Sequence, residues 1–328
     1  MANLTTTADL KTAVLQHAGE LTDGTSAYDT LVVTYLNRIY GELVCGGSTF
    51  VPELSEPWSW ARASAPGTLA LLPAYETGSA TLTNASTSGT FSDAPAASLG
   101  SFAGRFLQMF SRADVYRISA HTAGSASFTL DQAYQEATVT SSFSAAKLDY
   151  ALTSGIARLV EPFRVFQAQT GEGNQEGKIG SMSSDELHRN FPLHRLQSGV
   201  PTYFAIISES SSGVMTVRFN KTPLSAVRVE YEYVPYPTDL TSSPDTTPIV
   251  PREHRATLVY GATYWLMVDK NDSRADAYFR LTQQKIQGML LNRRREYDDT
   301  SDTFGKLVPR ADAYRGTNLT STSGMSYY

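Results

Sequence analysis

The sequence predicts an α+β chain: a helical bundle built from both chain ends plus an antiparallel β-sandwich, with a small inserted β-barrel-like domain. Apolar residues recur at three- and four-residue steps near each end, within residues 8–45 and 249–295. Short β-type segments fill the middle and are separated by turns rich in Ser, Thr, Gly and Ala. Because a pair of amphipathic helices leaves an apolar face uncovered, we expect the two pairs to pack on each other.

The C-terminal helix pair is predicted within residues 249–295. Pro251 suits a first helical position, where no backbone N–H is needed. An apolar stripe then reaches Leu266, and the polar run 269–272 interrupts it. Ser273 is predicted to cap the second helix, which is expected to end at Arg295.

The N-terminal pair is predicted within residues 8–45. Gly19 is expected to end its first helix, and Ser26 and Asp29 have the spacing of a capping box for the second. Apolar residues keep helical spacing for over four turns until Cys45-Gly46-Gly47 stops them.

The central segments are predicted to form β-structure. Strands with period-two alternation are expected at Met215–Phe219 and Val227–Tyr233, where charged residues mark a solvated face. A brief helical turn is predicted near Ile156, a polar loop over 171–180, and a short helix from Ser184.

These patterns divide the chain into five parts. Residues 1–77 hold the N-terminal helices and the entry to the sheet, 78–146 the inserted β-domain, and 147–248 the β-sandwich. Residues 249–297 are the C-terminal helix pair. Residues 298–328 contain too little apolar material for a core, and we predict a flexible docking arm there.

Composition limits the function classes. The formal net charge of −5 and the pI near 5.6 oppose tight nucleic-acid binding, which needs clustered cations. The single cysteine, Cys45, excludes an internal disulfide and a cysteine-based zinc site. The sequence has neither a membrane-length apolar run nor a signal-peptide pattern, so we expect a protein made and kept in a reducing cytoplasm.

The sequence predicts no catalytic residue, no cofactor and no metal. The glycine-rich segment 171–178 lacks the spacing of a phosphate-binding loop, and Ile179 stands where a magnesium-binding Ser or Thr is required. His188 and His194 are the only near pair of histidines, and they form no metal-binding motif. Asp298, Asp299 and Asp302 are interpreted as solvated residues rather than as a cation site.

Two further groups have alternative interpretations. Trp58 and Trp60 suit core anchors at a domain junction, or a platform for sugar stacking. The basic run 293–295 suits a helix C-terminus or an inter-subunit salt bridge better than a nucleic-acid contact, because acidic residues follow it at once.

The order of several segments resembles that of the head-to-tail adaptor proteins of tailed bacteriophages, also called tail tubular protein A or head-completion adaptors. The resemblance covers most of residues 28–295, with one departure at Leu152-Thr153, where a Leu-Pro is usual. The segments that carry it are Pro57-Trp-Ser-Trp60, Asp149-Tyr-Ala-Leu152, Ile156-Ala-Arg-Leu159, Gly199-Val-Pro-Thr-Tyr203, Val227-Arg-Val-Glu-Tyr-Glu-Tyr233 and Pro248-Ile-Val-Pro251, with Val115-Tyr-Arg-Ile118 and Thr129-Leu-Asp-Gln-Ala-Tyr134 in the β-insertion.

The resemblance implies a structural role in the neck of a virion. Members form a homo-oligomeric ring, usually of twelve subunits, below the portal protein. They present a surface to the next tail or nozzle component and leave a channel through which DNA passes without sequence-specific binding. We expect Arg293, Arg294, Arg295, Tyr327 and Tyr328 to contact the portal or a neighbouring subunit. The alternatives are a carbohydrate- or receptor-binding virion module that uses Trp58 and Trp60, and a cell-wall hydrolase.

Overall fold

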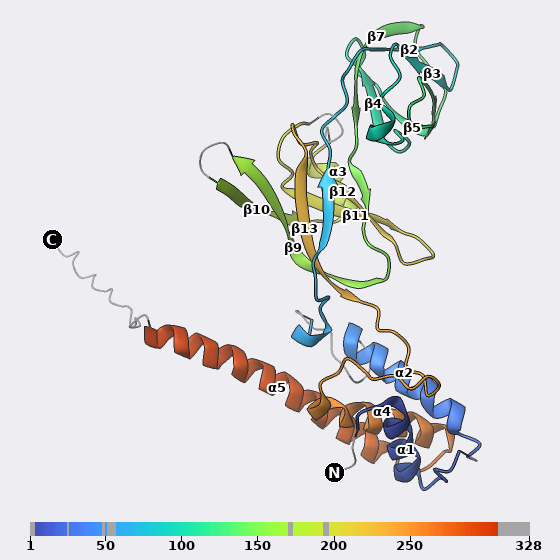
Figure 1. Ribbon diagram of the computed structural model, residues 1–328, viewed down its shortest axis with the longest axis vertical. Helices are drawn as coiled ribbons and strands as arrows, with labels where there is room; N and C mark the ends of the chain where they lie inside the picture. The colour runs from blue at the N-terminus through green and yellow to red at the C-terminus, as the bar shows by residue number, and fades with distance from the viewer. Residues whose placement is uncertain are drawn as a thin grey trace, which may run out of the picture. The chain divides into compact units, whose positions relative to one another are not determined.

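The computed structural model describes residues 4–24, 26–47, 50, 57–169, 173–192 and 197–307. It separates into two compact units, Met1–Trp60 with Pro237–Tyr328, and Ala61–Tyr236. The fold class is confirmed: the chain is α+β, with helices from both ends in the first unit and a closed barrel beside a larger sheet in the second (Figure 1).

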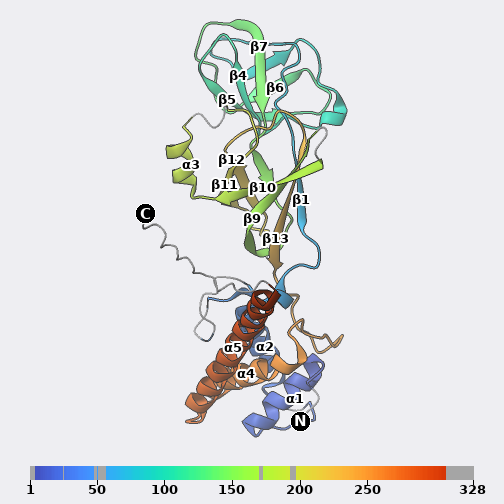
Figure 2. The same cartoon turned by 90° about the vertical axis from the view of Figure 1, so that its left-hand side faces the viewer.

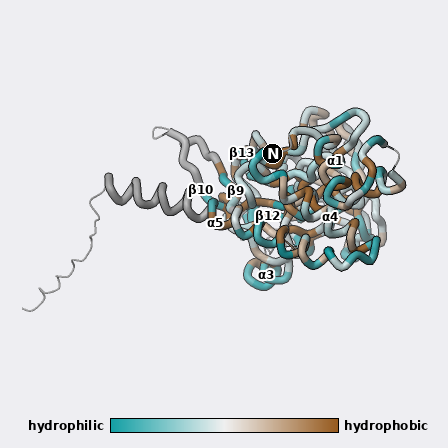
Figure 3. The backbone as a smooth tube through the Cα atoms, turned by 90° about the horizontal axis from the view of Figure 1, so that it is seen from below, coloured by the Kyte–Doolittle hydropathy of each residue, from teal (hydrophilic) through white to brown (hydrophobic). Residues whose placement is uncertain are grey.

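The helical unit contains four α-helices in its described part, together with short 3₁₀ turns at Ser59–Ala61 and Arg252–His254. The α-helices are α1 (Thr7–Ala18), α2 (Asp29–Cys45), α4 (Ala256–Asp269) and α5 (Ala275–Leu307). Helix α4 is apolar around most of its circumference, because it packs against α1, α2 and α5 together. Figure 3 marks its apolar residues in brown.

The ends of the N-terminal helices follow their residue types. Thr6 caps α1 through a capping box with Asp9, and Gly19 ends the helix in the left-handed conformation at φ 73°. Gly46 ends α2, as predicted. The predicted capping box of α2 is wrong, since Tyr28 is its N-cap residue and makes no side-chain cap bond. Ser26 instead accepts a hydrogen bond from the backbone N–H of Tyr28 at 3.2 Å.

The C-terminal helices differ from the prediction at three of their ends. Pro251 precedes a 3₁₀ turn, and α4 begins only at Ala256. Ser273 was predicted to cap α5, but the side chain that accepts a backbone N–H there is that of Asp272. Its carboxylate accepts from the N–H of Arg274 at 2.9 Å. Helix α5 also continues past Arg295 to Leu307. A formed helix adds residues of modest propensity at little cost, and no proline occurs in the sequence between Arg295 and Leu307.

The second unit contains a six-stranded barrel. Its strand order is β2-β3-β6-β5-β4-β7, and neighbouring strands are antiparallel where their pairing is described. The strands are β2 (Ser79–Leu82), β3 (Ser88–Phe91), β4 (Phe106–Met109), β5 (Val115–His121), β6 (Ser127–Leu130) and β7 (Val139–Ala146), with a 3₁₀ turn at Ala97–Leu99. Phe91, Phe102, Phe128 and Phe143 fill its interior with Leu107. The sequence interpretation missed β3, because Ser-Gly-Thr-Phe lacks a clear apolar alternation.

Seven strands form the larger sheet around a second aromatic core (Figure 2). They are β1 (Gly67–Leu71), β8 (Asp149–Ala151), β9 (Ile156–Gln169), β10 (Gly173–Ser181), β11 (Tyr203–Glu209), β12 (Met215–Phe219) and β13 (Val227–Pro235), in the order β1-β13-β9-β10-β11-β12-β8. All pairs are antiparallel except β10 with β11, which pair in parallel over two residues. Phe163 stacks on Phe204 at a centroid distance of 4.0 Å inside this sheet.

Two local predictions in this sheet are wrong. Ile156 begins the long strand β9 rather than a helical turn. Residues 173–181, expected as a loop, form β10 and pair with β9 from Gly173↔Gln169 to Ile179↔Phe163. The glycine-rich composition did not indicate this strand. Its backbone hydrogen bonds are made with β9 and require no large side chains. The short helix predicted from Ser184 is confirmed as α3 (Ser184–Asn190), which Ser183 caps.

Candidate assembly interface

Helix α5 carries the predicted contact residues of the C-terminal region. Arg293, Arg294 and Arg295 lie on this helix. In Figure 1 the C-terminal part of α5 runs past α1 and α4. Tyr327 and Tyr328 lie outside the described residues. The prediction that these five residues contact a portal or a neighbouring subunit therefore remains a prediction.

An aromatic cluster holds the base of α5 in the bundle. The ring of Phe50 lies 5.1 Å from those of Tyr264 and Phe279, centroid to centroid, and 6.2 Å from that of Trp265. Arg38 of α2 places its guanidinium carbon 3.5 Å from the centroid of the Trp265 ring. Such edge-on and cation–π contacts orient side chains more tightly than aliphatic packing does. These contacts orient the first turns of α5 and therefore fix the direction in which the helix leaves the bundle.

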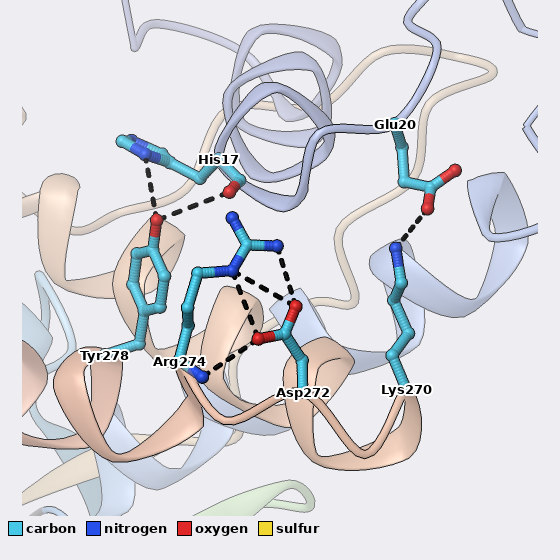
Figure 4. A network of polar contacts seen from close by, with 6 residues as sticks. All are labelled: His17, Glu20, Lys270, Asp272, Arg274 and Tyr278. Atoms are coloured by element: carbon cyan, nitrogen blue, oxygen red, sulfur yellow. Dashed lines mark hydrogen bonds and ion pairs between the residues drawn. The ribbon is translucent and has the colours of Figure 1, made fainter.

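Polar contacts join the end of α1 to the α4–α5 turn (Figure 4). The Tyr278 hydroxyl lies 3.4 Å from both Nδ1 and the carbonyl oxygen of His17, and Lys270 forms an ion pair with Glu20. Asp272 and Arg274 pair beside them, with Nη2 and Oδ2 2.7 Å apart. These contacts link the first helix of the chain to the start of the last one.

The acidity of Asp272 can be tested directly. Hydrogen bonds from the side chain and the backbone N–H of Arg274 lower its pKa to about 2. The stabilisation that follows from this lowered pKa is present at neutral pH and is lost as the pH falls through about 2. We expect NMR titration of the Asp272 carboxyl to give a midpoint near 2 in the wild type, and a clearly higher midpoint in Arg274→Gln, which loses the side-chain bond and keeps the backbone bond. A midpoint near 4 in both proteins would disprove the pairing.

Arg255 is a structural residue that the sequence interpretation missed. Its side chain is only 9% exposed and donates to four carbonyl groups at the start of α4. Nε donates to Val250 O at 2.8 Å, and Nη2 to Pro248 O at 3.1 Å. Nη1 donates to the carbonyl oxygens of Leu4 and Thr5, at 3.1 and 2.8 Å. One guanidinium thus fixes the N-terminus and the incoming segment on the same helix end.

The segment before α4 is also held on α2. The Asn37 side chain bonds both backbone groups of Leu240. Its Oδ1 accepts from the Leu240 N–H at 2.6 Å, and its Nδ2 donates to the Leu240 carbonyl oxygen at 3.0 Å. The Tyr40 hydroxyl accepts from the N–H of Ile249 at 3.1 Å, and the pKa of Tyr40 is raised because the group is buried. The Tyr35 hydroxyl donates to Asp269 at the end of α4. Both chain ends are therefore bound into one unit by side-chain contacts.

Trp58 offers no exposed face for sugar stacking, whereas Trp60 is half-buried. Trp58 is 3% exposed and donates from Nε1 to the carbonyl oxygen of Leu43 at 2.8 Å, near the end of α2. Trp60 stacks on it, with centroids 6.0 Å apart and planes 10° from parallel. A sugar ring needs an exposed aromatic face, so the interpretation of Trp58 as a core anchor fits its burial.

The other candidate sites have ordinary structural surroundings. His188 contacts Ser184 O through Nδ1 at 2.7 Å within α3, and His194 lies outside the described residues. Among the described residues, no group of three or more His, Cys, Asp or Glu side chains is placed to hold a metal ion. The described helices also include none with the length and apolar character needed to cross a membrane.

Two segments of the resemblance gain a physical explanation. Asn220 is fully buried, and its Oδ1 accepts from the N–H groups of Thr202 and Tyr203, at 3.0 and 3.1 Å, which shapes the turn 199–203. At the Leu152-Thr153 departure, Thr153 donates its backbone N–H to the Tyr231 hydroxyl at 3.0 Å. A proline there has no N–H to donate, so the turn uses a different bond.

Comparison with known families gives one result that bears on function. The family model described as SU10 adaptor protein matches residues 111–305, more than half of the chain. The match extends from just before β5, within the barrel, to near the end of α5. Comparison with curated proteins finds no match.

Proposed function

We propose that this chain, which belongs to the SU10 adaptor protein family and is a phage structural adaptor, connects the head of the virion to its tail. In this proposal, copies form a ring, expected to contain twelve subunits, between the portal protein and the next tail or nozzle component. The ring leaves a channel through which DNA passes. The closer relation to tail tubular protein A remains a prediction.

The observation that carries the proposal is the construction of α5. This helix is anchored at its base by aromatic and ionic contacts, and it continues for about 24 Å beyond Leu291 to Leu307. A long helix that leaves a packed unit presents a surface to other chains at little cost in folding free energy. We assign it the role of a docking element, with residues 308–328 as its extension.

The net charge supports the channel. A formal charge of −5 per copy makes the ring as a whole repel phosphates, and a repelling lining lets DNA slide. A strongly cationic lining would hold the DNA. The proposal thus needs no sequence-specific DNA contact.

The test is a truncation that removes residues 300–328. We expect the truncated protein to fold normally, by circular dichroism and thermal unfolding, and to fail to attach to DNA-filled heads in sedimentation assays. The reason is that the lost segment supplies the docking contacts, whereas the bundle contacts of α5 lie N-terminal to it. Normal attachment by the truncated protein contradicts the docking role.

Two sets of substitutions separate the contributions of the terminal tyrosines and of the arginines to docking. Tyr327→Ser with Tyr328→Ser removes the aromatic anchors, which are efficient interface residues. Arg293→Gln with Arg294→Gln and Arg295→Gln removes the basic run without breaking the helix. We expect each set to weaken attachment by on the order of tenfold, and the arginine set to lose more of its effect at high salt.

A further inference from the structure

The outward side of α5 combines exposed apolar and basic residues. Leu281 is 38% exposed and Leu291 54% exposed, whereas Thr282, Ile286 and Met289 are buried against the bundle. The outer face of α5 is defined here by its exposed residues Arg280, Leu281, Gln284, Lys285 and Leu291. Apolar side chains of this size at an exposed helical spacing are typical of a helix that packs on another surface.

The charge of residues 275–295, the first part of α5, is one-sided. Within residues 275–295 the basic residues are Arg280, Lys285, Arg293, Arg294 and Arg295, and the only acidic residue is Asp276. The chain as a whole is acidic, whereas this segment is basic. A partner for the outer face of α5 is therefore expected to carry exposed apolar residues within an acidic surround.

The helical unit itself contains such a surface. The loop after α1 and the turn after α4 are joined by the Lys270–Glu20 ion pair (Figure 4). Here Leu21 is 63% exposed and Val268 is 42% exposed. We call this surface the acidic tip, and its residues are Glu20, Leu21, Asp23, Val268, Asp269 and Asp272, whose four acids outnumber the two cations Lys270 and Arg274.

The two surfaces lie at different places on the same unit. The acidic tip adjoins the start of α5, whereas Leu291 lies 16 residues along the helix from Ala275, a distance of about 24 Å. A straight helix cannot fold back on its own base, so Leu291, at the far end of the outer face, does not meet the tip of its own copy. Complementary patches at separate places on one subunit produce a heterologous contact, which closes into a ring when the rotation between copies allows it.

We propose that the outer face of α5 in one copy packs on the acidic tip of the next copy. The occupant is a second copy because the charge and the exposed apolar residues of the two surfaces are complementary. The proposal rests on the ring of the proposed function and names its subunit contact. It assigns residues 280–291 to the neighbouring copy and leaves the part of the chain beyond residue 300 for the portal.

One variant on each surface tests the contact: the helix variant reverses two charges, and the tip variant replaces two apolar residues with lysine. The helix variant is Arg280→Glu with Lys285→Glu, and the tip variant is Leu21→Lys with Val268→Lys. All four side chains are exposed, so both variants are expected to keep the fold, as checked by circular dichroism and melting temperature. Each variant alone is expected to lose copies bound per DNA-filled head, and ring formation by native mass spectrometry, by on the order of tenfold.

Mixing the two variants provides the decisive result. The acidic α5 of one variant then meets a tip that carries two added lysines on one side, and a natural α5 meets a natural tip on the other side. Alternating copies are therefore expected to restore assembly at a one-to-one ratio. The matched control is Lys178→Glu with Arg228→Glu, which changes the charge by the same amount on β10 and β13 and is expected to assemble normally.

The outcomes distinguish the two proposals. Unchanged assembly by the helix variant, or no recovery in the mixture of two folded variants, overturns the subunit contact while wild-type attachment to heads still supports the adaptor role. Failure of the wild-type protein to attach to heads overturns the proposed function instead. Loss of binding to double-stranded DNA with unchanged assembly assigns the basic face of α5 to DNA and overturns the contact.

Discussion

Replacement of Arg255 with methionine is expected to destabilise the helical unit by about 3–5 kcal/mol, because hydrogen bonds from a charged group to four backbone carbonyls are lost. Methionine fills a similar volume but donates no hydrogen bond. Four carbonyl groups that now accept from the guanidinium then lose their donor, and two of them belong to the segment at Pro248 and Val250. Each buried carbonyl left without a donor costs about 1–3 kcal/mol.

The N-terminal segment gives this prediction a second consequence. Leu4 and Thr5 are bound to the start of α4 by the same side chain, so the variant also frees the residues just before α1. Water can replace the lost donor at these two positions more easily than at Pro248 and Val250. The expected loss is therefore smaller than the sum of four separate penalties.

Tryptophan fluorescence measures this effect in one unit alone. The three tryptophans, Trp58, Trp60 and Trp265, all belong to the helical unit. Urea unfolding followed by their emission should shift to a lower midpoint in Arg255→Met, while β-sheet signals of the other unit keep theirs. Arg255→Lys keeps the charge but has no planar fork, so we expect an intermediate midpoint.

A surface arginine serves as the control for the arginine itself. Arg274 is exposed and pairs with Asp272 at the surface, so Arg274→Met is expected to leave the unfolding midpoint almost unchanged. An Arg255→Met protein that unfolds at the wild-type midpoint contradicts the four-carbonyl arrangement as a source of stability.

The role of Arg255 also shows what the sequence could not predict. Amphipathic spacing predicted α2, since Leu36 and Leu43 lie two helical turns apart on one face and both are buried. Two of the four partners of Arg255 are backbone carbonyls about 250 residues away in the chain, and a carbonyl carries no residue-type signal. Long-range side-chain-to-backbone contacts of this kind follow from the folded topology alone.

The β-structure shows the same division between local and distant information. Strand β12 was predicted correctly because Met215, Val217 and Phe219 alternate with polar residues. Strand β10 was not predicted, because its pairing energy comes from β9 and its own residues are small or polar. The predicted contact residues, Arg293 to Arg295 with Tyr327 and Tyr328, remain a prediction, because helical spacing indicates a helix but not the surface that it meets.

Substitution of Gly261 by alanine is expected to destabilise the helical unit by about 1–2 kcal/mol, although alanine is the better helix former. A Cβ atom at this position on α4 would lie 2.9 Å from Cδ1 and Cγ1 of Ile39 on α2, and 3.0 Å from its Cγ2. Ile39 is 3% exposed and cannot move into solvent. The overlap must therefore separate two helices that pack closely only because this residue lacks a side chain.

Gly288 provides a matched control with the opposite sign. It is also a helical glycine, on α5, but an added Cβ there meets no atom within 4 Å. Gly288→Ala is expected to stabilise the unit by about 0.5–1 kcal/mol, because alanine loses less backbone entropy on folding. The pair separates the helix propensity of alanine from the steric overlap with α2.

A double-mutant cycle identifies the atoms responsible. Ile39→Ala removes all three atoms that the new Cβ would approach, so Gly261→Ala should cost less in that background than in the wild type, by about 1 kcal/mol. The free energies come from urea unfolding followed by tryptophan fluorescence. Equal costs in both backgrounds, or stabilisation by Gly261→Ala alone, would show that α2 and α4 do not cross closely at this glycine.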